Sequence, residues 1–294
     1  MDINVFHDRT GHLSEPILRE SARQQGITLT GRMEPCNSCL PARGQRAPVA
    51  KRSGGRVERD LAPNDVLAID MCGPFTPSLG GNLYMFYGVD HATGYIVNYG
   101  LRRKSEALAV FKRCVVDMAH KAGTAVKCVR GDCDALWTSR GFVEFCDSMG
   151  IAREHSPPGA QKYNGVAESA IQRCNKVGMA SRRSALRRLG PEGFSCIEGM
   201  DPRGDRLWAE SAKDAAQKLN QSASPSNPGR ASPQEMFTNM KGPFGVLPFL
   251  QEGFMSVTPQ NTLADRAVRV FFLNGGDNHA SCTVKVINAA TGRA

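Results

Sequence analysis

Long apolar runs and acidic residues are scarce in this 294-residue sequence. No stretch approaches the roughly 18 consecutive apolar residues that a membrane-spanning helix needs, so we expect no membrane partner. The first residues, MDINVFHDRTGH, also lack an apolar signal segment. We therefore expect the ten cysteines to stay reduced inside the cell.

Acidic residues are outnumbered by basic ones, 28 to 37, which gives a formal net charge of +9. This balance favours a polyanionic partner, nucleic acid first, although many basic proteins bind none. The hydrophobic fraction is 41%, and the length is ample for one large domain with one or two small ones.

Composition divides the chain into four predicted parts. Residues 1–45 hold closely spaced His and Cys pairs, and 46–62 form a basic linker with Pro and Gly. Residues 63–222 have the pattern of a large domain core with its following helices. Residues 223–294 combine a linker with a small β-rich segment.

The order of elements in the large part predicts its fold class. Three short β-rich runs come first, VLAID, LYMFYGVD and YIVNYG, and a helical pattern comes next over 105–122. Strand, helix, strand and helix then alternate. Consecutive strands imply hairpins and the alternation implies parallel crossovers, so we predict an α/β fold with a mixed five-stranded sheet flanked by helices.

Three acids stand at informative places in this pattern. Asp70 ends the run VLAID, and Asp132 ends AVKCVRGD. An acid at the end of a buried strand lies at a sheet edge, where α/β folds usually bind ligands. Taken alone, each aspartate is also compatible with an ordinary turn.

The third acid, Glu168, comes four residues after Asn164, where a Pro/Gly loop gives way to a helix. A helical wheel places it on the polar face with Gln172 and Lys176. The helix dipole also favours an acid in the first turns, so a plain surface glutamate is the alternative.

Two residue pairs near the N-terminus have metal-ligand spacing. His7 and His12 are separated by four residues, and Cys36 and Cys39 by two. Two imidazoles and two thiolates suit tetrahedral Zn²⁺, which would staple a segment too short to form its own core. The alternative is a chance pairing, since a lone CxxC is a weak signal.

A basic run continues from the loop before Glu168 along the helix that holds it. Such a run is often only a solvated face, but next to three acids it suits phosphate contacts. The predicted DNA-binding residues are Gln161, Lys162, Asn164, Gln172, Arg173, Lys176, Arg182 and Arg183.

The segments VLAIDMCGPF, CVRGD and YNGVAES resemble the D,D(35)E catalytic core of copia-type LTR retrotransposon integrases, an RNase H-like fold. FHDRTGHLS and CNSCLPARGQRAP are similar to the His-His-Cys-Cys zinc module (GAG-pre-integrase-like) that precedes that core. The helix at 207–220, SPQEMF and the β-rich tail resemble the segments on the C-terminal side of the core in that family. The motifs are specific in 7–39 and 66–176.

The resemblance implies a function. Asp70, Asp132 and Glu168 would hold two Mg²⁺ (or Mn²⁺) ions for end processing and strand transfer. His7, His12, Cys36 and Cys39 would hold one structural Zn²⁺. The partners would be double-stranded DNA, as element ends and target, and further copies of the chain. The expected location is the nucleus, with a cytoplasmic particle stage.

One departure from the family pattern leaves alternatives open. The second Asp is usually followed by Asn-Gly-Gly-Glu-Phe, whereas Asp132 is followed by Cys133, Asp134, Ala135 and Leu136. A catalytically impaired or domesticated DNA-binding relic is therefore an alternative. Further alternatives are a nuclease for RNA–DNA hybrids and a zinc-dependent protein-interaction module. The sequence shows no protease or reverse transcriptase signature, so a polyprotein fragment and a domesticated gene both fit.

Overall fold

The computed structural model describes residues 1–43, 61–155, 164–242, 244–259, 265–277 and 283–294. The predicted linker therefore lies mostly outside the described residues, as do Gln161 and Lys162. Within the described ranges, no helix is long and apolar enough to span a membrane.

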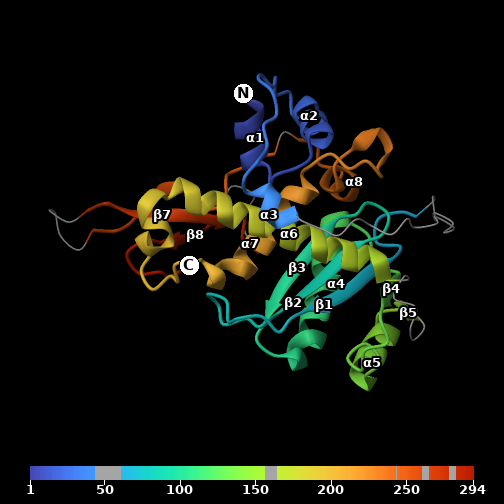
Figure 1. Ribbon diagram of the computed structural model, residues 1–294. Coiled ribbons are helices and arrows are strands. Elements are labelled where there is room, and N and C mark those ends of the chain that lie inside the picture. Colours follow the sequence, from blue (N-terminus) through green and yellow to red (C-terminus); the bar gives the residue numbers. More distant parts are fainter. Residues whose placement is uncertain (44–60, 156–163, 243, 260–264, 278–282) are drawn as a thin grey trace.

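The central element is a mixed five-stranded sheet in the order β3-β2-β1-β4-β5 (Figure 1). β1 is antiparallel to β2, β2 is antiparallel to β3, and β4 runs parallel to both β1 and β5. The prediction of an α/β fold with a mixed five-stranded sheet is thus confirmed. The strands are β1 (Leu67–Cys72), β2 (Tyr84–Asp90), β3 (Ile96–Leu101), β4 (Cys128–Gly131) and β5 (Ala152–His155).

Residues along β1 alternate between two cores, because successive side chains in a strand point to opposite faces. Leu67 and Ile69 pack into the core that includes α4 (Ala107–Ala122) and α5 (Arg140–Ser148). Ala68 faces the other core, formed with α6 (Gly165–Arg188) and α7 (Trp208–Asn220). Asp70 is two residues beyond Ala68, so it projects toward the α6 side of the sheet.

Helix α6 connects the parts of the molecule (Figure 1). Its first half packs on β1 and β2, and Ala185 near its end joins the core of a second sheet. Gly178 allows α7 to cross closely, because a Cβ there would lie 2.9 Å from the Ser211 carbonyl oxygen. Position along α6 therefore decides which part of the molecule a side chain meets.

Helix α7 also closes the open edge of the sheet. The side-chain amide of Asn220 accepts from the Ile96 N–H at 2.8 Å and donates to the Ile96 carbonyl at 2.7 Å. These are the two bonds that another strand would make to β3. An unpaired edge invites pairing with other chains, so Asn220 protects β3.

Two smaller units flank the central sheet. The N-terminal unit contains α1 (Ile3–Arg9), α2 (Glu15–Gln24) and α3 (Cys39–Arg43), with a small core around Ile3, Phe6 and Leu18. After α8 (Pro233–Thr238), the C-terminal part forms a three-stranded antiparallel sheet in the order β6-β7-β8. Its strands are β6 (Glu252–Ser256), β7 (Ala267–Asn274) and β8 (Lys285–Asn288). The small β-rich tail predicted from the sequence is thus present, and the boundaries of the four predicted parts stay predictions.

Candidate functional site

Asp70 and Asp132 come from neighbouring parallel strands at the same level. The register pairs Ala68 of β1 with Arg130 of β4, and the two aspartates each lie two residues further on. Asp132 directly follows the last residue of β4. Neighbouring strands are about 5 Å apart, so these two carboxylates share one edge and one face of the sheet.

Glu168 is brought to the same edge by the start of α6. Asn164 precedes the helix, is buried, and donates its side-chain amide to the Ile69 carbonyl at 3.2 Å. This bond fixes the start of α6 beside β1, next to Asp70. Glu168 then lies in the first turn of the helix, over the α6 face of the sheet.

The pKa of Asp70 is raised by its burial and by the acids around it. Burial first, and then the negative charges of Asp132, Glu168 and Asp134, raise its pKa to about 6, although the Met71 N–H donates to the carboxylate at 2.7 Å. Like charges in one site disfavour further ionisation. A divalent cation would relieve that repulsion, and carboxylate oxygens are the ligands that Mg²⁺ prefers. The three acids therefore offer the donor chemistry that such an ion requires.

The three carboxylates are nevertheless less tightly gathered than the donors of the His and Cys pairs near the N-terminus. Within the described part of the chain, the acids form no group whose oxygens are close enough to grip one ion as they stand.

The loop that departs from the family pattern is ordered around Trp137. This side chain is 2% exposed and packs against Phe86, Phe111 and Phe142. Asp134 accepts from the Leu136 N–H at 3.0 Å, and its own N–H donates to Asp132 at 3.2 Å. Asp134 thus closes the turn and adds a negative charge to those of Asp70, Asp132 and Glu168.

The predicted DNA-binding residues divide by position along α6. Gln172 and Arg173 are exposed and Lys176 is half-buried. Asn164 is buried and offers little surface to DNA in this conformation. Arg182 and Arg183, further along, are half-buried.

Arg182 differs most from its sequence-based interpretation. Its guanidinium donates to the Gly204 carbonyl at 3.4 Å, and burial lowers its pKa although Asp205 and Asp201 act in the opposite direction. A role in holding the 201–205 turn on α6 accounts for this position.

The His and Cys pairs meet at one point. The donor atoms of His7, His12, Cys36 and Cys39 all lie within 4.8 Å of one another. His7 Nε2 is 3.3 Å from Cys39 Sγ, and His12 Nδ1 is 3.5 Å from Cys36 Sγ. Zn–N bonds of about 2.0 Å and Zn–S bonds of about 2.3 Å at tetrahedral angles place such atoms about 3.5 Å apart. The cluster therefore has the dimensions of a tetrahedral zinc site.

The surroundings prepare these four residues for binding a metal. His7 Nδ1 is 2.9 Å from the Leu13 carbonyl, which fixes the ring and leaves Nε2 for the metal. Burial would raise the pKa of the Cys36 thiol, but the backbone N–H groups of Cys39 and Ser38, the Cys39 side chain and the charge of Arg187 together lower it. A lowered pKa favours the thiolate, which is the form that binds metals.

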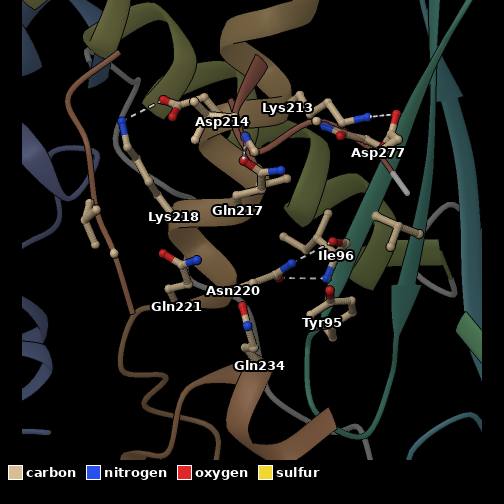
Figure 2. Close-up of a pocket in the computed structure, with 18 of the residues that line it drawn as sticks. Tyr95, Ile96, Lys213, Asp214, Gln217, Lys218, Asn220, Gln221, Gln234 and Asp277 are labelled. Carbon is tan, nitrogen blue, oxygen red and sulfur yellow. Dashed lines mark hydrogen bonds and ion pairs between the residues drawn. The ribbon is translucent and has the colours of Figure 1, made fainter. Parts of the chain in front are cut away.

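A separate cavity of about 390 Å³ lies between β3, α7 and the C-terminal part (Figure 2). Its charged groups are largely paired with one another. Lys218 binds Asp214 at 2.7 Å, and Lys213 binds Asp277. The three carboxylates do not line this cavity, so it is not the site of the predicted chemistry.

Comparisons with known proteins agree with the sequence motifs. No protein-family model matches the chain. The chain is 30% identical over 285 residues to the "Retrovirus-related Pol polyprotein from transposon TNT 1-94" of Nicotiana tabacum. The chain is a relative of this retrotransposon Pol polyprotein. The match covers 94% of the chain and 20% of the relative, so the chain spans about a fifth of the polyprotein's length. The retrotransposon relationship predicted from the sequence is thereby confirmed.

Solved structures similar to this chain include three of viral origin. A chain of the simian T-cell lymphotropic virus intasome has 14% identity and a TM-score of 0.44, with 82% of both chains covered. The BIV integrase catalytic core has 13% identity and a TM-score of 0.38, covering 60% of this chain and 95% of that one. The HTLV-2 integrase catalytic core has 15% identity and a TM-score of 0.41, covering 61% and 99%.

Proposed function

We propose that the chain is a retrotransposon integrase that joins element DNA ends to target DNA by divalent-metal-dependent phosphoryl transfer. The observation that carries this proposal is geometric: Asp70 and Asp132 lie at the same level of neighbouring strands, and the Asn164–Ile69 hydrogen bond holds the start of α6, with Glu168 in its first turn, beside them. Sixty-one residues lie between the first two acids and thirty-five between the last two, so the proposal depends on the strand register and on the Asn164–Ile69 hydrogen bond rather than on proximity in the sequence.

The roles of the three acids are set by the chemistry of phosphoryl transfer. A pair of Mg²⁺ or Mn²⁺ ions, when bound, supplies an activated water or DNA 3′-hydroxyl and stabilises the departing 3′ oxygen. Asp70, Asp132 and Glu168 would hold these ions through their carboxylate oxygens.

DNA would approach along the first half of α6. Gln172, Arg173 and Lys176 come after Glu168 within two to three turns, so phosphates bound there would lie beside the carboxylates. Contacts of this kind give affinity with little sequence reading. Gln161 and Lys162 are proposed as additional contacts from the preceding loop.

We assign a structural Zn²⁺ to His7, His12, Cys36 and Cys39. All four donors are protein side chains, which fills a tetrahedral site and leaves no position for a substrate. The ion would hold the N-terminal unit together.

The chain would act as a homo-oligomer, since two DNA ends must be joined together. It would act in the nucleus.

A strand-transfer assay tests the proposal. Purified protein, a blunt element-end oligonucleotide and plasmid DNA are incubated with Mg²⁺ or Mn²⁺, and joined products are counted. We expect joining that requires the cation and is lost in Asp132→Asn and Glu168→Gln. Glu144→Gln, an exposed acid on α5, is the matched control and should retain the wild-type rate. Equal activity of Asp132→Asn and wild type would refute the assignment.

A DNA-binding relic is the second candidate. The segment Cys133–Leu136 replaces the family's usual residues, and the acids are not gathered tightly enough to grip one ion as they stand. The relic predicts DNA binding along α6 with no joining in either cation. The same assay, run beside a DNA-binding measurement, separates the two.

A further inference from the structure

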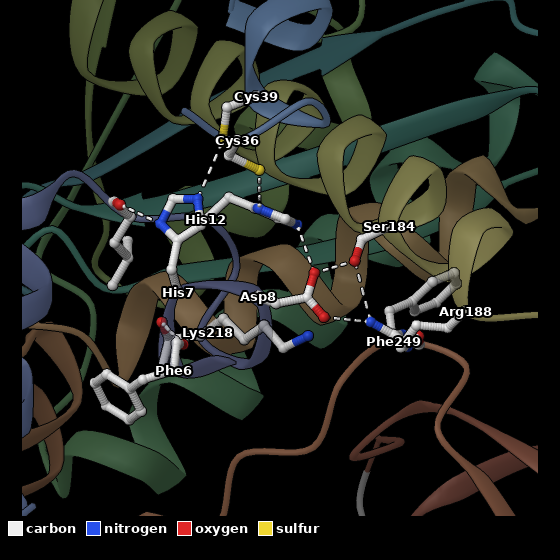
Figure 3. Close-up of polar contacts among 12 residues, drawn as sticks. Phe6, His7, Asp8, His12, Cys36, Cys39, Ser184, Arg188, Lys218 and Phe249 are labelled. Carbon is white, nitrogen blue, oxygen red and sulfur yellow. Dashed lines mark hydrogen bonds and ion pairs between the residues drawn. The ribbon is translucent and has the colours of Figure 1, made fainter. Parts of the chain in front are cut away.

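Asp8 lies on α1 between the two histidines of the His/Cys cluster, and its carboxylate points toward α6 (Figure 3). One oxygen, Oδ1, is 3.5 Å from His12 Nε2 and also accepts from the Ser184 hydroxyl. The other, Oδ2, is 2.5 Å from Arg188 Nη1. A single carboxylate therefore meets the N-terminal unit and the last turn of α6.

The contact between Asp8 and His12 is of the kind that fixes the orientation and raises the basicity of a metal-binding histidine. His12 Nδ1 faces Cys36 Sγ, so its Nε2–H is turned toward Asp8. Histidine ligands usually donate their second ring N–H to a carboxylate or carbonyl, which fixes the ring and raises its basicity. His12 is fully buried, so solvent cannot replace Asp8 in this role.

The contacts with α6 form a closed set of polar groups. Ser184 and Arg188 are one turn apart, and Arg188 Nη1 is 3.1 Å from Ser184 Oγ. Arg188 Nη2 also donates to the Phe249 carbonyl, in the segment before β6. The set around Asp8 thus joins three parts of the chain that are far apart in sequence.

The turn between the histidines also packs tightly on α6. Gly11 has φ +84°, and a Cβ there would lie 2.9 Å from Val177 Cγ1. A close-packed interface transmits small displacements. A displacement of His12 or Asp8 would thus also displace α6.

We propose that Asp8 is a positioning residue that couples metal binding by the His/Cys cluster to the C-terminal half of α6. The inference rests on the proposed zinc site. Coupling between two sites is reciprocal, so changes at Ser184 and Arg188 should alter metal affinity although neither residue is a ligand. The helix that receives this coupling is the one whose first turn holds Glu168.

The experiment measures zinc affinity of the full chain by competition with a chromophoric chelator. Loss of an outer-shell partner typically weakens metal binding about 10-fold to 100-fold, so Asp8→Asn should fall by at least about 10-fold. Ser184→Ala and Arg188→Met should weaken it several-fold. The double variant Asp8→Asn/Arg188→Met should lose less than the sum of the two single changes, because both act through one network.

Matched controls and a second measurement protect the test against simple misfolding. Glu15→Gln removes an exposed carboxylate of the same unit, and Ser169→Ala removes an exposed hydroxyl of α6; both should bind zinc as wild type does. Hydrogen exchange of zinc-loaded Asp8→Asn should show faster exchange in residues 181–188, with the central strands unchanged. Unaltered affinity in Asp8→Asn, or fully additive changes, would overturn the coupling. A wild-type chain that binds no zinc would instead overturn the proposed zinc site itself.

Discussion

The side chain of Asn164 donates a hydrogen bond to the carbonyl of Ile69, the residue immediately before Asp70. This contact between the start of α6 and β1 sets where Glu168 stands relative to the two aspartates. Substitution of Asn164 should therefore change the position of Glu168 relative to Asp70 and Asp132, although Asn164 is not itself a proposed metal ligand.

Asn164→Ala should weaken catalysis more than it weakens folding. Removing the amide leaves the buried Ile69 carbonyl without this donor, which costs about 1–3 kcal/mol. It also frees the start of α6, so Glu168 loses its position and strand transfer should fall at least about 10-fold. Denaturant unfolding and the joining assay measure the two effects. Asn175→Ala, exposed on the same helix, should change neither.

Asp70→Asn should stabilise the protein in the absence of divalent cations. The pKa of Asp70 is raised to about 6, above the ordinary value of about 3.9 in an unfolded chain. The native state therefore binds the proton more tightly than the unfolded state does. Ionised Asp70 therefore lowers the stability of the folded wild-type protein. This loss of stability is absent below about pH 4, grows as pH rises, and is complete above about pH 6.

The gain in free energy of unfolding expected for Asp70→Asn follows from the raised pKa of Asp70. It is on the order of 1–3 kcal/mol, allowing for the partial exposure of Asp70. Urea unfolding of wild type and Asp70→Asn in chelator, at pH 5 and pH 7.5, measures it. The difference should be larger at pH 7.5. A variant that is less stable than wild type at pH 7.5 would show that the acids do not repel Asp70.

Cys36→Ser should abolish stoichiometric zinc and unfold the N-terminal unit. The apolar core of that unit is small, and structural zinc supplies folding free energy directly. Metal analysis should find one zinc per wild-type chain and none in the variant, with a loss of helical circular dichroism. Cys133→Ser changes an exposed cysteine outside the cluster and should retain one zinc.

Arg173→Gln and Lys176→Gln should each weaken DNA binding in a salt-dependent way. Each phosphate contact contributes about one unit to the slope of log affinity against log salt. The slope should therefore fall by about one per substitution, with little change in sequence preference. Arg140→Gln on α5 removes the same charge from the other side of the sheet and should leave the slope unchanged. Equal effects at Arg140 and Arg173 would indicate a general charge effect.

The sequence predicted the elements whose local pattern decides their structure. β1 was visible because five residues of VLAID combine an apolar run with a terminal acid, and the His/Cys cluster because its spacing suits one metal. β6 was missed, since EGFMS is short, contains Gly and is largely exposed. The contact of Asp8 with Ser184 joins residues 176 positions apart, and no local signal reveals it.

The helical wheel drawn for the first half of α6 agrees with the burial of its residues. Ala170, Cys174 and Val177 are buried as the wheel requires. Beyond Val177 the helix leaves the central sheet and meets the N-terminal unit, the 201–205 turn and the C-terminal part. Side chains there are covered from several sides, so Arg182, which the basic run predicted as a DNA contact, is half-buried.

Cation binding at the three acids tests the central claim most directly. Mn²⁺ binding, monitored by electron paramagnetic resonance in the zinc-loaded chain, should show sites in wild type and in Glu144→Gln. Asp70→Asn, Asp132→Asn and Glu168→Gln should each lose Mn²⁺ binding or weaken it by at least about 10-fold, because loss of a direct ligand should cost no less than loss of an outer-shell partner. Wild-type Mn²⁺ affinity in all three variants would contradict a shared metal site and, with it, the proposed integrase chemistry.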